Sequence, residues 1–381
     1  MHERTFIGLD VHARSVQAGV LDGLTGEVKS LAVPVATKAL VAWVCAQPAP
    51  AVTYEAGPTG YELARALLAA GVPCLVAAPS RIPRAPGERV KTDRRDAVRL
   101  ARLLRLEELV AVRVPGLAEE AARDLVRARE DARGDLMRAR HRLSKLLLRR
   151  GIVWEERAWT QAHELWLVRQ RFSERPLQIA YEEALAAMLS VRDRRDALDA
   201  AIAVEAAMEP WAETVARLAC LRGVSTLTAF ALTVEIGDWQ RFRGRSLAAF
   251  LGLTPSESSS GASRRQGAIT KTGNAHVRRL LVEAAWQQRR RPGKSLRTHL
   301  ARAAQPAAVR ERAVAAERRL RHRWVRFDER GKRSTVAAVA VARELAGWCS
   351  EPRGDRRLRG TAERRRGERV GRVRGASASL L

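Results

Sequence analysis

The order of the apolar segments in the first 80 residues is the feature that most constrains the fold of this chain. Residues 5–12 (TFIGLDVH), 16–22 (VQAGVLD) and 26–35 (GEVKSLAVPV) have the apolar, β-branched character of three short strands separated by turn residues. After them, helical spacing over 36–47 and 60–71 alternates with strand-like segments at 51–57 and 72–79. The sequence therefore predicts the element order β-β-β-α-β-α-β.

Three consecutive strands before the alternation are less usual for a doubly wound sheet and are typical of an RNase H-like domain. The fold class expected for the whole chain is α+β and mostly α. It combines an RNase H-like α/β domain with a helical coiled-coil arm and an all-α C-terminal domain.

Four acids stand where this fold would bring them together. Asp10 and Glu55 each end an apolar strand, where a buried carboxylate is costly without a cation. Asp93 and Asp96 are three residues apart in the first turn of a helix predicted to begin at about Asp93, so they share one face. Acids at a helix N-terminus also complement the helix dipole, and that plainer role stays open for each aspartate alone.

Two acids at strand ends and a pair at a helix start form a cluster of the kind that holds two divalent ions near one phosphate. Hard oxygen ligands favour Mg²⁺ or Mn²⁺ over zinc. The four cysteines lie far apart without a paired CxxC spacing, which argues against a zinc ribbon and a disulfide framework.

A second candidate site lies in residues 252–285. Four serines occur between Ser256 and Ser260, followed by Gly261 and a set of cations and turn residues. A hydroxyl beside cations is suited to face a phosphate, since the cations neutralise its oxygens. The alternative is a polar surface loop ahead of an amphipathic helix, and the stretch by itself leaves both interpretations open.

The charge of the chain indicates its partner. With 69 basic and 42 acidic residues the formal net charge is +27, which points to a polyanion, and nucleic acid is the default. The N-terminus lacks the apolar core of a signal peptide, and the apolar runs meet charges before a membrane-spanning length. We therefore expect a cytoplasmic, nucleoid-associated protein without a membrane partner.

The remaining segments are predicted to be largely helical. Residues 119–150 and 176–208 have the spacing of two antiparallel arms of a helical hairpin. Residues 218–237 read as helix, turn and helix, and the turn at Gly223 could offer backbone N–H groups to a phosphate, although a simple turn fits equally well. The domains expected are 1–112, 113–209, 210–349 and an Arg-rich disordered tail over 350–381.

Five motifs in a fixed order give the chain a family resemblance. They are GLDVHARSVQAGVLD, YEAGPTGYELARAL, GERVKTDRRDAVRLARLL, LRGVSTLTAFALTVEIGDWQRF and GLTPSESSSGASRRQGAITKTGNAHVRRLLVEAAW. Together they resemble the DEDD-type insertion-sequence transposases, which join a RuvC-like N-terminal domain to a C-terminal serine transposase domain. Some members are bridge-RNA-guided recombinases. The motifs span about residues 6–290, and RGKRSTVAAVAVAREL extends the likeness to about 345.

The resemblance implies roles for individual residues. Asp10, Glu55, Asp93 and Asp96 match the catalytic DEDD acids that bind divalent metal, expected as two Mg²⁺ or Mn²⁺ ions. Ser260 matches the nucleophile, with Ser259 as its rival. The nucleic-acid-binding residues expected around it are Arg264, Arg265, Lys271, Asn274, Arg278, Arg279 and, further upstream, Gly223.

The activity implied is metal-dependent DNA cleavage and rejoining through a phosphoserine–DNA intermediate. The partners implied are the element ends and target DNA, a non-coding guide RNA and further copies of the chain in a dimer or tetramer. Two alternatives stay open: a RuvC-like junction nuclease that uses water, and a non-catalytic nucleic-acid-binding protein.

Overall fold

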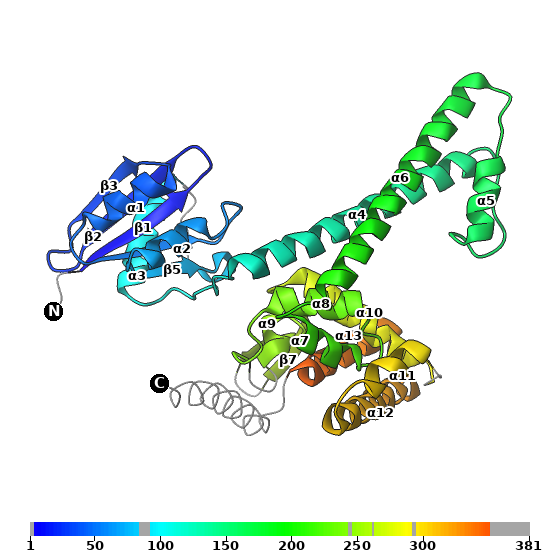
Figure 1. Ribbon diagram of the computed structural model, residues 1–381. Helices are drawn as coiled ribbons and strands as arrows, with labels where there is room; N and C mark the ends of the chain where they lie inside the picture. The colour runs from blue at the N-terminus through cyan, green and yellow to red at the C-terminus, as the bar shows by residue number, and fades with distance from the viewer. Residues whose placement is uncertain (1–3, 84–91, 243–245, 261–262, 292–294, 351–381) are drawn as a thin grey trace, which may run out of the picture. The chain divides into compact units, whose positions relative to one another are not determined.

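A computed structural model covers the chain and describes residues 4–83, 92–242, 246–260, 263–291 and 295–350 (Figure 1). By its internal contacts the chain divides into two compact units, Met1–Leu117 and Ala118–Leu381. The Arg-rich tail expected beyond residue 350 lies outside the described residues.

The first unit is built on a mixed five-stranded sheet. Its strands are β1 (Thr5–Val11), β2 (Val16–Asp22), β3 (Val28–Val33), β4 (Pro50–Glu55) and β5 (Cys74–Ala77). The spatial order is β3-β2-β1-β4-β5, with β1–β2 and β2–β3 antiparallel and β1–β4 and β4–β5 parallel. Together with α1 (Thr37–Cys45) and α2 (Glu62–Ala69), the predicted order β-β-β-α-β-α-β is found. This mixed sheet is consistent with an RNase H-like domain.

Helices cover both faces of this sheet. Leu40 of α1 and Leu67 of α2 pack on Ile7, Leu9 and other buried strand residues on one face. The other face carries α3 (Asp93–Arg105), which follows a short 3₁₀ turn at Pro79–Arg81. Because side chains alternate along a strand, the residues that point to α3 are those between the core positions, including Gly8 and Asp10.

A pair of glycines lets α3 lie directly on the strands. Gly8 of β1 pairs with Gly19 of β2 in the sheet register. A Cβ on Gly8 would lie 2.2 Å from the backbone oxygen of Ala97, and one on Gly19 would lie 2.5 Å from the backbone nitrogen of Val98. Both distances are far inside van der Waals contact, so the approach of α3 requires glycine at both positions.

The second unit begins with the helical arm. The long helices α4 (Leu117–Leu148) and α6 (Arg175–Glu205) run side by side with the short α5 (Gln161–Arg169) next to them (Figure 1). The three helices share a core that includes Leu143, Leu167 and Met188. The predicted helical segments at 119–150 and 176–208 therefore form, with α5 between them.

The rest of the second unit is a helical body around one apolar core. Its helices are α7 (Ala212–Ala219), α8 (Thr226–Ile236), α9 (Ser246–Phe250), α10 (Ala275–Trp286), a 3₁₀ turn at Gln287–Arg289, α11 (Leu296–Ala303), α12 (Ala307–Glu329) and α13 (Ser334–Cys349). Phe230, Leu281, Trp324 and Val341 are among its buried residues. Among the described residues, no helix is long and apolar enough to cross a membrane.

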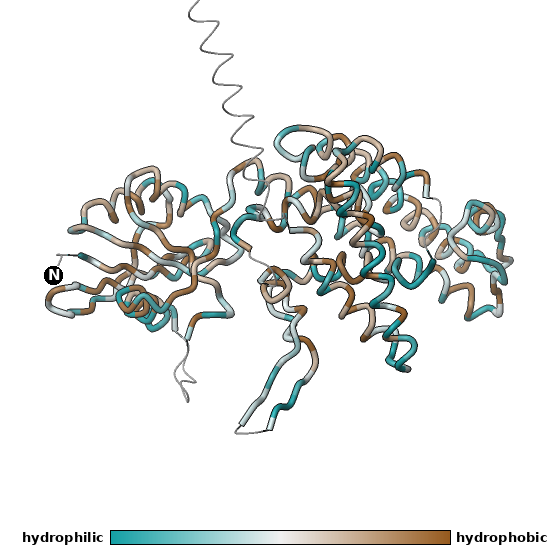
Figure 2. Tube along the Cα trace, turned by 90° about the horizontal axis from the view of Figure 1, so that it is seen from below, coloured by the Kyte–Doolittle hydropathy of each residue, from teal (hydrophilic) through white to brown (hydrophobic). Residues whose placement is uncertain are grey.

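The expectation of an all-α C-terminal domain is wrong at the serine stretch. Strands β6 (Pro255–Ser260) and β7 (Ser263–Ile269) form a two-stranded antiparallel hairpin. In Figure 2 its strands run out from the helices mostly in the pale and teal colours of polar residues. Both strands are exposed along almost their whole length, so neither face needs apolar residues, and the alternation that would reveal a strand is absent.

Candidate functional site

The end of β1 and the start of α3 meet in a small polar cluster. One ligand atom each of Asp10, His12 and Asp93 lies within 4.8 Å of the others. Nε2 of His12 is 3.3 Å from Oδ1 of Asp10 and 4.0 Å from Oδ2 of Asp93. Asp10 is the last but one residue of β1 and His12 directly follows the strand, so the two side chains, two positions apart in extended chain, lie on the same side.

The position of Asp93 follows from how α3 begins. Thr92 is the N-cap residue, and its side-chain oxygen accepts a hydrogen bond from the backbone N–H of Arg95 at 3.3 Å. The predicted pair Asp93 and Asp96 is thereby in the first helical turn. Since Gly8 allows α3 to rest on β1, this turn reaches the strand end that carries Asp10.

The other two predicted acids lie outside this three-residue cluster. Asp96 accepts a hydrogen bond from Arg99 at 2.8 Å and has only 14% of its side chain exposed. Glu55 is exposed at the end of β4 and follows Tyr54, the parallel partner of Leu9. By register Glu55 is therefore at the position beside Asp10, on the face of the sheet that carries α3.

The two distances from His12 are compatible with a divalent ion held between the three side chains. The ligand atoms of an octahedral ion with bonds of about 2.1 Å lie about 3.0–4.2 Å apart. Both distances from His12 fall in this window. The two carboxylates are hard ligands that suit Mg²⁺ or Mn²⁺, and the imidazole adds a nitrogen donor. His12 was not predicted from the sequence, although the Asp-x-His spacing at a strand end could have indicated it.

The two candidate serines lie on opposite faces of the β6–β7 hairpin. In the register Ser259 is opposite Arg264, Ser260 opposite Ser263, and Ser258 opposite Arg265. Side chains alternate between the faces, so Ser260 shares its face with Ser258 and Arg265. The turn residues Gly261 and Ala262 lie outside the described residues.

The face that carries Ser259 has its own ion pair. Ser259 donates a hydrogen bond from Oγ to Oε1 of Glu257 at 2.9 Å, and Arg264 contacts Oε2 of the same carboxylate at 2.8 Å. These hydrogen bonds, first from Arg264 and then from Ser259, lower the pKa of Glu257. The hydroxyl of Ser259 and the guanidinium of Arg264 are therefore both engaged by the carboxylate of Glu257. Neither contact involves Ser260.

The base of the hairpin is fixed to the helical body. Arg278 donates from one nitrogen to the backbone oxygens of Leu251 at 2.9 Å and Thr272 at 2.8 Å, one on each side of the hairpin. Gly252 and Gly273 have φ of +64° and +70°, and a Cβ on either would lie within 2.5 Å of backbone on the opposite side. Lys271 also has a positive φ, and its N–H donates to Gly252 at 3.1 Å.

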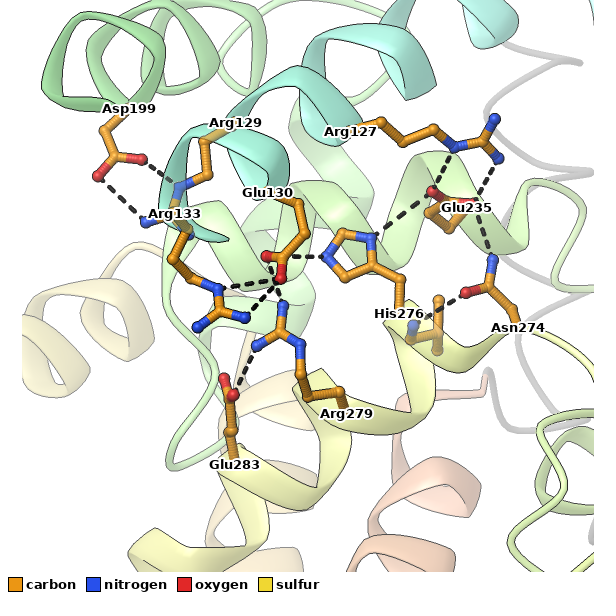
Figure 3. Close-up of polar contacts among 11 residues, drawn as sticks. Arg127, Arg129, Glu130, Arg133, Asp199, Glu235, Asn274, His276, Arg279 and Glu283 are labelled. Atoms are coloured by element: carbon orange, nitrogen blue, oxygen red, sulfur yellow. Dashed lines mark hydrogen bonds and ion pairs between the residues drawn. The ribbon is translucent and has the colours of Figure 1, made fainter. Parts of the chain in front are cut away.

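Asn274 joins this base to a buried acid of α8. Its side-chain oxygen accepts from the N–H of Val277 as the N-cap of α10, while Nδ2 donates to Glu235 at 2.8 Å. The side chain of Glu235 is only 2% exposed and also accepts two hydrogen bonds from Arg127 of α4, at 3.1 and 3.2 Å. Figure 3 shows the three side chains converging on one another.

His276 extends these contacts to a second acid of α4. Its two ring nitrogens each lie 3.7 Å from a carboxylate, Nδ1 from Glu235 and Nε2 from Glu130 (Figure 3). Glu130 is also paired with Arg133 at 2.7 Å and with Arg279 at 2.6 Å. The arm helix α4 is thus tied to α8 and α10, and through Asn274 to the base of the hairpin.

These contacts keep the carboxylate of Glu235 ionised. Burial by itself raises the pKa of a carboxyl, but hydrogen bonds from His276, Arg127 and Asn274, with the positive charge of Arg127, lower the pKa of Glu235 to about 2. Glu235 was not predicted from the sequence, since a lone acid within an apolar helix gives no pattern that names its partners.

The predicted nucleic-acid-binding residues have different surroundings. Arg264 and Arg265 lie on the exposed hairpin. Arg278, Asn274 and Arg279 make the contacts within the unit given above. Gly223 has φ of +86°, and a Cβ there would lie 2.4 Å from the backbone oxygen of Ala284, so α10 packs directly against this turn. Binding by these residues stays a prediction.

A mixed sheet with acids gathered at the end of its central strand, joined to a helical unit, is consistent with an RNase H-like nucleic-acid enzyme. Comparison with known proteins narrows this class. Residues 7–150 match a family model for the DEDD transposases of IS110, described as "Transposase". Residues 215–301 match the model described as "Transposase IS116/IS110/IS902 family".

Two relatives extend the likeness over most of the chain. "Putative transposase y4qE" of Sinorhizobium fredii is 42% identical over 297 residues, which are 77% of this chain and 73% of the relative. "Transposase for insertion sequence element IS1533" of Leptospira borgpetersenii is 32% identical over 352 residues, 87% of this chain and 99% of the relative. The chain belongs to the IS110 family of DEDD-type insertion-sequence transposases. Membership implies an enzyme that cleaves and rejoins DNA.

Proposed function

We propose that this transposase cuts and rejoins DNA with the Ser260 hydroxyl as nucleophile and the strand-end acids as the holders of divalent metal. The observation that carries the proposal is the cluster of Asp10, His12 and Asp93, whose ligand atoms have the spacing of a metal site. The ion would supply charge neutralisation at the scissile phosphate and stabilise the leaving oxygen.

The protein residues then have defined tasks. Asp10, His12 and Asp93 would hold one ion, and Glu55 and Asp96 would contribute ligands to a second. Asp96 would release Arg99 on binding it. Mg²⁺ or Mn²⁺ matches the carboxylates, and the imidazole of His12 makes the donor set less purely oxygen than the four acids alone.

The serine step conserves the phosphodiester bond energy. The Ser260 oxygen forms a bond to phosphorus as the bond from phosphorus to one sugar oxygen breaks; serine loses its proton and the leaving sugar hydroxyl gains one. The reverse step, with a hydroxyl of a new strand, frees the serine and joins that strand to the phosphate. Arg265, on the same face of the hairpin as Ser260, is placed to neutralise the phosphate oxygens.

The partners proposed are DNA at the element ends and target, a non-coding guide RNA, and a second or further copy of the chain that lets acids and serine of different protomers act on one phosphate. These partners follow from the family resemblance. The formal charge of +27 supports binding to nucleic acid in general and does not choose between DNA and RNA.

Substitution of one cluster acid tests the metal role. Asp10→Asn keeps the shape of the side chain and removes its charge, so we expect strand cleavage to be lost while DNA binding persists. Asp131→Asn, at an exposed position of α4, is the matched control and should cleave as the wild type does. Unchanged cleavage by Asp10→Asn would exclude the proposed metal site and favour a binding-only protein.

A further inference from the structure

The helix α12 carries a row of arginines that the chemistry proposed above does not use. Arg319, Arg323, Arg326 and Arg330 follow one another at steps of four, three and four residues, and we name these four residues the arginine stripe. At about 100° per residue, all four fall within an arc of about 60° around the helix axis. They therefore form a single line along one side of α12 and its C-cap.

The acids of α12 are kept off this side. The helix contains Glu311, Glu317, Asp328 and Glu329, and the same helical geometry places each of them at least about 60° outside the arc of the stripe. Glu317 instead pairs with Arg222 and Arg302 on another face, at 3.3 and 2.8 Å. A face made for solubility alone would mix the two signs, so the separation of charge calls for an anionic partner.

The stripe lines two hollows of the surface. Arg319 and Arg323 border both of them. The smaller, of about 140 Å³, also contains Arg326 and Arg330. The larger, of about 550 Å³, continues between α12 and α13 to Arg312 and Arg343. The lining residues described in the two hollows include six arginines and one carboxylate.

That single carboxylate organises the stripe and does not neutralise it. Glu344 of α13 accepts a hydrogen bond from Nε of Arg319 at 2.7 Å and forms an ion pair with Arg323, whose Nε lies 3.2 Å from its other carboxylate oxygen. Both arginines line the two hollows as well. For the side chains of Arg326, Arg330 and Arg343 no hydrogen bond or ion pair is found within the part of the chain that the structure describes, and Arg326 and Arg330 are exposed.

We propose that the arginine stripe, with Arg343, is a binding site for the phosphate backbone of a nucleic-acid strand. From Arg319 to Arg330 the stripe is about 16 Å long, the rise of roughly five nucleotides of one strand. Guanidinium groups bind phosphate oxygens in pairs, which an ammonium group does not do. The two aromatic rings of the hollows, Phe327 and Trp348, are already covered by Arg323 and Arg312, so backbone contacts rather than base stacking hold the strand.

This site goes beyond the proposed strand-transfer chemistry, because binding there needs neither the acids nor the serine. Its test uses the full chain, and a matched pair of double variants separates a local effect from the loss of net charge. Arg326→Gln with Arg330→Gln removes two charges from the stripe. Arg310→Gln with Arg318→Gln removes two charges from other faces of α12, at exposed positions.

Binding of labelled single-stranded DNA, single-stranded RNA and duplex DNA would be measured against salt concentration. Because two guanidinium groups no longer neutralise phosphates, the stripe variant should bind its ligand roughly tenfold more weakly, and its salt slope for a single strand should fall by about 1.4. The control variant should stay within about twofold of the wild type. Substitution of Arg326 and Arg330 by Lys should restore most of the salt slope, because the charge returns.

The nucleic acid that shows the selective loss identifies the strand bound at the stripe. Equal losses in the stripe and control variants with all three ligands would overturn the proposal, since net charge alone would then explain the binding. No loss in either variant would overturn it as well. Because none of these assays requires cleavage, their result is independent of the test of Asp10.

Discussion

Asp10 and His12 lie side by side at the end of β1, with Oδ1 of the aspartate 3.3 Å from Nε2 of the histidine. The two side chains share a side because His12 directly follows the strand and is two positions from Asp10. Asp93, the first residue of α3, completes the group, with its Oδ2 4.0 Å from the same nitrogen. The imidazole therefore stands between two acids that the chain supplies from segments more than 80 residues apart.

His12→Asn should weaken catalysis without abolishing it. The variant loses one donor of the proposed metal site and leaves both carboxylates, so we expect strand cleavage to fall by about 10- to 100-fold. The metal concentration needed for half-maximal cleavage should rise in parallel, while DNA binding stays unchanged. A metal titration of cleavage checks this, with His299→Asn, an exposed histidine of α11, as the control. Equal cleavage by the variant and the wild type at limiting metal would show that His12 is not a metal ligand.

Gly8→Ala should disrupt the cluster of Asp10, His12 and Asp93 by displacing α3. The added Cβ would lie 2.2 Å from the backbone oxygen of Ala97, so α3 has to move away from the sheet and carry Asp93 with it. We expect the free energy of unfolding to fall by about 1–3 kcal/mol, as for other overpacked cores, together with a loss of cleavage.

Denaturant unfolding and the cleavage assay measure the two effects of Gly8→Ala separately. Gly116→Ala is the matched control, since a Cβ at Gly116 would meet no atom within 4 Å. Wild-type stability and cleavage in Gly8→Ala would show that α3 does not need the close approach.

Glu235→Gln should change how stability depends on pH. The pKa of Glu235 lies at about 2 in the folded chain against an ordinary value of 4.5, so its charge stabilises the fold above about pH 4.5, and this stabilisation is lost as the pH falls toward 2. The shift in pKa corresponds to a contribution of about 3 kcal/mol to the free energy of unfolding at neutral pH. The wild type should therefore be more stable than the variant at pH 7, and the difference should shrink as the pH falls below 4.5.

Unfolding by urea at several pH values measures this difference. Glu329→Gln, which removes an exposed carboxylate of α12, provides the comparison and should show little change at any pH. A pH-independent difference between Glu235→Gln and the wild type would mean that the ionised carboxylate does not hold α4 to α8 and α10.

The sequence predicted the first unit well because its buried strands and amphipathic helices have clear periods. Tyr54 and Leu9 are apolar because they face a core, and the acids that follow them stand out against that pattern. The meeting of Asp10 with Asp93 could be expected from this order. The close packing of α3 on Gly8 and Gly19 could not be expected from the sequence, since a glycine in a strand does not reveal which helix lies on it.

The second unit was harder to predict from sequence where the structure depends on polar contacts between distant segments. The β6–β7 hairpin has no apolar alternation, so the sequence of residues 255–269 does not indicate strands. The pairs of Glu235 and Glu130 with Arg127 and Arg279 join helices more than 100 residues apart, and any of many arginines would have fitted the sequence equally well. Cross-strand register, which places Ser259 and Ser260 on opposite faces, required the structure.

Ser260 is proposed to form a covalent bond with DNA. The most direct measurement is a protein–DNA adduct that survives denaturation, formed with Mg²⁺ and labelled DNA that carries the element ends. Ser259→Ala is the matched control, because it removes the neighbouring hydroxyl from the opposite face of the same exposed hairpin. We predict the adduct in the wild type and in Ser259→Ala, and its loss together with strand joining in Ser260→Ala. Strand joining retained by Ser260→Ala would exclude Ser260 as the nucleophile.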